Sequence, residues 1–196
     1  KIKVKLMQVK DVRGTANRVT ESQILDDIEL FELKAFSLLV VEMRELLLSA
    51  NITVVSLPDL EPVVNILDPE KMRIPHFYVY DAYSPELAAL RAKMKTLKMD
   101  EKTEERVLDQ LQFEHTELED QIREKLSEQI HPYKKEINEA LTNTATLDIL
   151  LAKAQQTIDM QLCKPGISSG TTRYIKIFNP QVKEVLWQEG KKFQAI

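Results

Sequence analysis

The sequence predicts a mainly α fold: a helical bundle core with a long, protruding, lever-like helical hairpin and short β segments at the two ends. The 196 residues include only four glycines, whereas an average chain of this length has about 14. Hydrophobic residues make up 43% of the chain, which is enough to form a core. Most of them recur every three or four positions, as in helices that bury one face.

The first 50 residues begin with a change of pattern. Residues 1–6 alternate lysine with apolar residues, which predicts a half-buried strand. Residues 11–18 then read as a turn. Thr20 and Gln23 fit a capping box that opens a long helix, and Asn51 ends it.

Four prolines follow within residues 58–75 and leave room for one short helix at 59–67. The aromatic and β-branched residues 76–80 predict a brief extended segment. Ser84 as a cap, with Pro85 at the first helical position, then starts another helix.

Two long helical patterns form the predicted lever hairpin, residues 85–131. The first covers residues 85–98, and a cap at Thr103 opens the second, residues 104–131. A helix of this second length is about 42 Å long, more than a compact bundle of 22.6 kDa needs. Pro132 interrupts the pattern, which then resumes as far as Ile158.

The C-terminal residues change character again. Residues 164–170 form a predicted loop, 174–178 a strand, and 180–187 a short helix that Gly190 ends. We therefore divide the chain into residues 1–169, the helical core and lever, and residues 170–196, a strand and short helix leading into a further domain. We expect the chain to be a piece of a longer protein.

The sequence predicts no catalytic, metal-binding or cofactor-binding residues. A phosphate-binding loop needs G-x-x-x-x-G-K-[ST], and none of the glycines has that spacing. The three histidines lack the spacing of zinc ligands. Cys163 has no base beside it in the sequence, so it is interpreted as an ordinary thiol.

Charge limits the classes of partner. The chain has 27 basic and 31 acidic residues, a net charge of −4. Residues 101–128 hold ten acids and four bases, so DNA is not expected along that helix. Acidic pairs such as Asp26–Asp27 and Glu119–Asp120 are interpreted as solvated surface. No apolar run is long enough to span a membrane, and we expect a cytoplasmic protein.

One basic cluster stands out on the outgoing helix of the hairpin. Arg91, Lys95 and Lys98 are spaced i, i+4 and i+7, so they share one helical face. They are the candidate DNA-binding residues. Two interpretations remain open: contact with phosphates, or solubility together with pairing to acids on the returning helix. No aromatic residue is interleaved, so stacking on bases is not supported.

Several segments resemble one known family in their order and spacing. Residues 77–91, FYVYDAYSPELAALR, resemble the "ysPeLaelR" start of a lever helix in MutS-type DNA mismatch repair proteins. Residues 146–154, TLDILLAKA, resemble the "lDvLla.A" stretch of the returning lever. Residues 117–122 suit the returning helix, and Lys164-Pro165 with residues 175–180 resemble the transition into the ATPase domain.

The resemblance implies a core and lever segment that couples ATP binding in a C-terminal ATPase domain to binding of mismatched or otherwise irregular double-stranded DNA. ATP and Mg²⁺ are then cofactors of the parent protein and not of this segment, and the full-length protein is expected to be a homodimer. Two features depart from the family. Only residues 99–103 stand where it usually inserts a β-rich clamp, and Asn179-Pro180 stands where it often has His-Pro.

Two other classes of function remain as alternatives. A helical scaffold or coiled-coil adaptor that binds protein partners fits the same apolar spacing, although it does not need the tail at residues 174–196. An enzyme in its own right is the third possibility, and no group of residues supports it.

Overall fold

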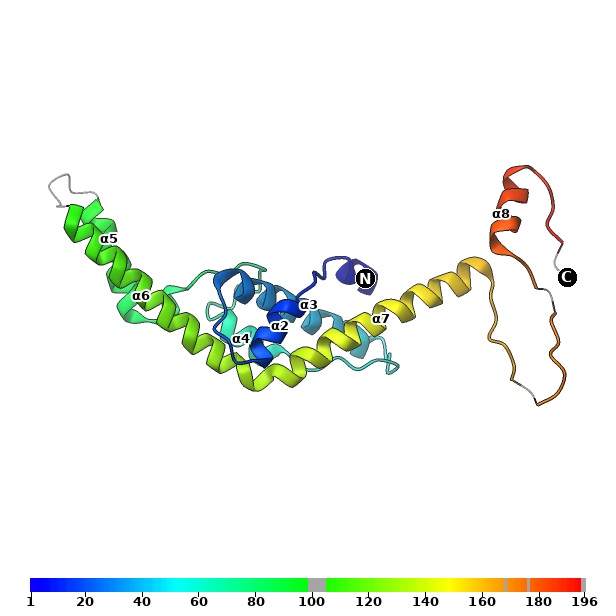
Figure 1. Ribbon diagram of the computed structural model, residues 1–196, viewed down its shortest axis with the longest axis horizontal. Coiled ribbons are helices and arrows are strands. Elements are labelled where there is room, and N and C mark those ends of the chain that lie inside the picture. Colours follow the sequence, from blue (N-terminus) through cyan, green and yellow to red (C-terminus); the bar gives the residue numbers. More distant parts are fainter. Residues whose placement is uncertain (99–104, 168, 176, 195–196) are drawn as a thin grey trace. The chain divides into compact units, whose positions relative to one another are not determined.

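The computed structural model describes residues 1–98, 105–167, 169–175 and 177–194. The chain divides into two compact units, Lys1–Asp148 and Ile149–Ile196, and the boundary falls within helix α7 (Lys134–Met160). The secondary structure of the described residues consists of helices joined by loops and turns, and it includes no β-strand. The mainly α prediction is therefore confirmed (Figure 1).

Both predictions for the N-terminal residues were wrong. Residues 1–6 form helix α1 (Ile2–Leu6) instead of a strand. No described strand lies beside them to satisfy an extended backbone, whereas Lys5 Nζ pairs with Glu42 Oε2 of helix α3 (Asp27–Ser49) at 2.5 Å. The predicted turn at 11–18 is mostly helix α2 (Arg13–Thr20), whose Ala16 and Val19 are buried.

The start of α3 also differs from the prediction. Thr20 ends α2, so it does not cap the next helix. Instead Asp26 Oδ1 accepts a hydrogen bond from the Glu29 amide at 2.8 Å, and Glu29 Oε2 accepts one from the Asp26 amide at 3.0 Å. This capping box lies six residues after the predicted one. Asn51 follows the helix with φ of 55°, as expected for a residue that ends it.

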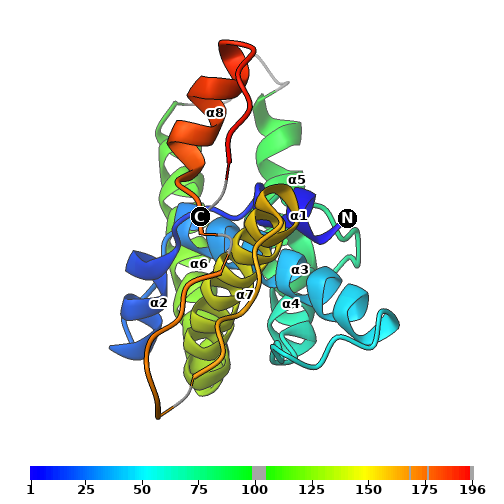
Figure 2. The ribbon, with the colours of Figure 1, turned by 90° about the vertical axis from the view of Figure 1, so that its right-hand side faces the viewer.

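The core of the first unit lies between α3, α4 (Glu61–Leu67) and the long helices α6 (Glu105–Ile130) and α7. Helices α3 and α4 pack side by side, as Figure 2 shows. Burial of their aliphatic side chains supplies the main driving force for folding. The larger aliphatic and Met side chains that are fully buried in these helices are Leu30, Leu33, Val40, Met43, Val63, Leu67, Ile130 and Ile137.

The predicted hairpin is present in the first unit. Helix α5 (Pro85–Lys98) follows the short 3-10 helix η1 (Asp81–Tyr83) and packs against α6 (Figure 1). Leu90, Met94 and Leu111 form its buried apolar seam, with Leu97 and Leu118 packed beside them. The predicted cap at Thr103 lies outside the described residues.

Proline sets the break between α6 and α7. The 3-10 helix η2 (His131–Tyr133) separates them, and Pro132 lies at its centre. Since proline lacks an amide proton, it cannot continue the helical ladder. The interruption predicted from the sequence is confirmed here.

The second unit has a different character. Helix α8 (Pro180–Gln188) is capped by Asn179 Oδ1, which accepts from the amides of Gln181 and Val182, and Gly190 follows it with φ of 69°. The predicted strand at 174–178 was wrong for its described residues, which are not in a strand. None of the described residues in 149–194 is buried, so nothing there covers an extended segment.

Candidate functional site

The three residues predicted to bind DNA lie together on α5. Arg91, Lys95 and Lys98 line one groove between α5 and α6, of about 310 Å³. Met94, Gln112 and His115 complete its lining. The helical spacing read from the sequence therefore brings the three cations to one place.

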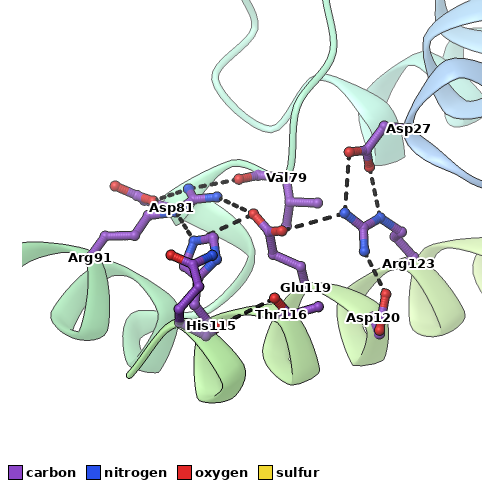
Figure 3. Close-up of polar contacts among 10 residues, drawn as sticks. Asp27, Val79, Asp81, Arg91, His115, Thr116, Glu119, Asp120 and Arg123 are labelled. Carbon is purple, nitrogen blue, oxygen red and sulfur yellow. Dashed lines mark hydrogen bonds and ion pairs between the residues drawn. The ribbon is translucent and has the colours of Figure 1, made fainter. Parts of the chain in front are cut away.

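Arg91 is occupied by internal contacts (Figure 3). Its Nη1 donates to the Val79 carbonyl at 2.8 Å and to Asp81 Oδ1 at 2.5 Å. Its Nη2 donates to Glu119 Oε1 at 2.8 Å, and its Nε donates to His115 Nε2 at 3.0 Å. Burial acts to lower the pKa of Arg91, but the hydrogen bonds to Asp81 and Glu119 outweigh it and raise the pKa.

Lys95 and Lys98 are in a different position from Arg91. Both are exposed, and neither forms an ion pair with another residue in the described part of the chain. Of the two interpretations of the basic cluster, pairing with acids on the returning helix therefore applies to Arg91. Phosphate contact stays a prediction for the two lysines.

A second arginine continues the network along α6. Arg123 Nε donates to Asp27 Oδ1 of α3 at 2.8 Å, and Nη1 donates to Asp120 Oδ1 at 2.6 Å. Its Nη2 also lies 3.4 Å from Glu119 Oε2. The hydrogen bond to Asp27 is the largest influence on the pKa of Arg123, which is raised although burial opposes the shift. Glu119 therefore joins the two arginines into one network, which we call the hairpin brace.

The hairpin brace connects four segments: the start of α3, the residues around η1, α5 and α6 (Figure 3). Sequence reasoning missed Asp81 and Arg123, and it interpreted Asp27, Glu119 and Asp120 as solvated acids. Asp120 is 64% exposed, but the Glu119 side chain is only 19% exposed and Asp27 accepts two hydrogen bonds. The i, i+4 spacing of His115, Glu119 and Arg123 was the available signal for a shared face.

A separate polar cluster holds the loop after α4 against α3. The ammonium of Lys34 is fully buried and donates to Asp68 Oδ1 at 3.0 Å and to the Tyr80 hydroxyl at 2.9 Å. Burial acts to raise the pKa of Asp68, but hydrogen bonds from the Arg73 amide and Lys34 outweigh it and lower the pKa. Because every member has a partner, this cluster reads as structural.

Other candidate chemistry is limited. Within residues 1–98, 105–167, 169–175 and 177–194, no group of three His, Cys, Asp or Glu side chains is arranged to hold a metal ion. Cys163 is exposed. In the same part of the chain, no helix combines the length and apolar character that crossing a membrane requires.

Comparison with known proteins does not assign the chain. No family model matches it, and no curated protein sequence matches it either. The likeness to MutS-type proteins therefore rests on the sequence segments alone, in their order and spacing: residues 77–91, 117–122, 146–154, 164–165 and 175–180.

Proposed function

We propose that this chain is the core and lever segment of a MutS-like DNA mismatch repair ATPase. It is non-catalytic, and it couples ATP binding in a C-terminal ATPase domain to binding of mismatched or otherwise irregular double-stranded DNA. The observation that carries the proposal is the long α5–α6 hairpin together with the hairpin brace that ties it to α3.

A lever has to be long, stiff and fixed to the part that drives it. Helix α6 has 26 residues, which corresponds to about 39 Å. The bidentate contact of Arg123 with Asp27 anchors α6 to α3, and Arg91 anchors α5 to α6. Planar guanidinium groups hold carboxylates in a defined orientation, so movement of α3 is passed to the hairpin.

The positions of the motifs agree with this reading. Arg91 is the last residue of the motif in residues 77–91, and its polar contacts join α5 to α6 beside the apolar seam. The second motif, residues 146–154, lies within α7, which continues from α6 after the Pro132 break. In this proposal, the role of Arg91 is to hold α5 against α6.

The proposal is that DNA contacts the part of the hairpin that carries cations without an ion pair among the described residues. Lys95 and Lys98 near the end of α5 are the phosphate contacts, while ATP and Mg²⁺ belong to the ATPase domain. The parent protein acts as a homodimer.

The decisive test distinguishes the effect of ATP on DNA affinity from the binding of ATP itself. In the full-length protein, we expect Arg123→Gln to leave ATP affinity within twofold, because no residue of the brace takes part in nucleotide binding. ATP should then change DNA affinity much less than in the unaltered protein, since α6 is no longer held to α3. Fluorescence anisotropy of labelled mismatched DNA, with and without ATP, measures the change in DNA affinity, and anisotropy of a fluorescent ATP analogue measures the ATP affinity.

Arg106→Gln is the matched control, because Arg106 lies on the same helix without an ion pair among the described residues. It should leave the coupling unchanged. Full coupling in the Arg123 variant would refute the lever.

One observation favours the alternative, a helical adaptor for protein partners. Helix α8 exposes apolar side chains, with Trp187 at 82% and Val185 at 53%. In the lever proposal the ATPase domain covers this surface, and in the adaptor a separate protein does. The fluorescence of Trp187 in the full-length protein distinguishes them, because a covered indole emits at shorter wavelength and resists quenching by acrylamide.

A further inference from the structure

His115 lies where α5 meets α6, and its contact with Arg91 indicates which ring nitrogen accepts a hydrogen bond. Arg91 Nε, which can only donate, points at His115 Nε2 at 3.0 Å. Nε2 must therefore accept, so the proton of the neutral ring is on Nδ1. A protonated ring would present N–H to N–H at this contact.

The other ring nitrogen does not favour the protonated form. Nδ1 of His115 is buried and has no hydrogen-bond partner among the described residues. The charged groups near the ring on α5 are Arg91, Lys95 and Lys98, which line the same groove, and Asp81 lies behind Arg91. On α6, Glu119 Oε1 lies 3.5 Å from Nε2.

This arrangement contains two exclusive sets of contacts. With neutral His115, Arg91 of α5 bonds to both His115 and Glu119 of α6, so the contacts run between the helices. With protonated His115, Nε2–H donates to Glu119 one turn away on the same helix, and Arg91 loses one acceptor and shares the other. Protonation of His115 would thus replace the Arg91–His115 contact between α5 and α6 by a His115–Glu119 contact within α6.

We propose that protonation of His115 is a switch that loosens the packing of α5 against α6. The hairpin is tightly closed when the ring is neutral and opens more readily when it is charged. Histidine is the side chain whose charge ordinarily changes between pH 5 and 8, so this is the pH range in which the proposal is tested. This inference goes beyond the proposed function and does not depend on DNA or ATP.

His131 provides a contrast within the same chain. Its Nδ1 donates to the Val19 carbonyl at 2.8 Å, and its Nε2 accepts from Lys134 Nζ at 3.2 Å. Among the described residues, the charged group that forms a hydrogen bond with the His131 ring is Lys134. The Ser22 hydroxyl, 3.1 Å from Nε2, can accept from a protonated ring. A protonated His131 ring would therefore have an acceptor at each nitrogen, whereas Nδ1 of His115 has none among the described residues.

Amide hydrogen exchange of the whole chain at pH 7.5 and pH 5.0 tests the switch, with rates corrected for the intrinsic effect of pH. We expect protection in α5 to fall about tenfold at pH 5.0, the effect of losing one hydrogen bond to a charged group. In His115→Gln, an amide oxygen can still accept from Arg91 but does not titrate. Its α5 protection should stay within twofold between the two pH values.

His76→Gln is the control, since His76 lies on neither hairpin helix, and it should keep the acid response. The proposal is overturned if α5 protection in the unaltered chain is the same at both pH values. It is also overturned if His115→Gln responds to acid as the unaltered chain does, or if His76→Gln removes the response. Because no DNA is present, these outcomes are independent of the test of the proposed function.

Discussion

A buried lysine illustrates how single residues hold this fold. The Lys34 and Asp68 side chains are 0% and 2% exposed, and the Tyr80 hydroxyl that completes the cluster donates to the His76 carbonyl at 2.9 Å. A buried ion pair gains little over apolar packing, but removing one partner leaves an uncompensated charge. The cluster therefore makes the position of the loop after α4 sensitive to each member.

We predict that Lys34→Met lowers the free energy of unfolding by about 3–5 kcal/mol, because Asp68 is left buried without its cation. Lys5→Met is the matched control: the Lys5–Glu42 pair is partly exposed at 32% and 45%, so its loss should cost about 1 kcal/mol or less. Urea unfolding at pH 7 measures both. Equal effects would contradict a structural role for the buried pair.

The same cluster gives stability a defined pH dependence. The pKa of Asp68 is lower in the folded chain than its ordinary value of about 3.9. Its contribution is therefore complete above that ordinary value and is lost as pH falls through the lower folded pKa. In Asp68→Asn, this part of the acid dependence should be missing.

At the scale of elements, two faces of helix α5 carry side chains with different roles. Its apolar face and Arg91 close the hairpin, while Lys95 and Lys98 face solvent beside the groove. Helical periodicity alone groups Arg91 with the lysines. The positions of Asp81 and Glu119 show that Arg91 is paired inside the protein, in contrast to Lys95 and Lys98.

We predict that Lys95→Gln with Lys98→Gln weakens DNA binding and lowers the slope of log K against log salt by about 2, since each phosphate contact contributes about 0.9. Lys93→Gln, an exposed lysine of the same helix outside the groove, should change the slope by less than half as much. Anisotropy titrations between 50 and 200 mM salt measure the slopes. A slope that is unchanged in the double variant would exclude these lysines as phosphate contacts.

At the scale of the whole molecule, the two units differ in what they bury. The unit Lys1–Asp148 contains every buried residue of the described chain, whereas Ile149–Ile196 contributes none. Its apolar side chains, such as Ile167 and Tyr174, stay exposed at 101% and 72%. Without burial, little opposes local opening of the backbone.

We predict that limited trypsin digestion cuts first after Arg173, which is exposed and outside any helix. Lys164 is protected by the following proline, which trypsin does not tolerate. Cleavage after Arg123 in α6 should be slower, because that side chain is 17% exposed and held by Asp27. Mass spectrometry of the early fragments identifies the order, and early cuts in α6 would show that the hairpin is not braced.

The sequence by itself determined the mainly helical fold and those helix ends that depend on neighbouring residues. Pro85 starts α5, Pro132 separates α6 from α7, and Gly190 follows α8 as expected. These prolines and this glycine act through the residues beside them, so their effects can be read without the fold, whereas the capping box of α3 was placed six residues too early.

Tertiary structure decided what depends on residues far apart in the chain. Residues 1–6, in which lysines alternate with apolar residues, form a helix in which Lys5 pairs with Glu42 of α3, and no strand of the described residues lies beside them. Arg91 became a structural residue because His115 and Glu119, 24 and 28 positions later, lie against it. Arg123 meets Asp27 across 96 positions. No local pattern encodes such pairs, because they form only when packing of the apolar faces brings the helices together.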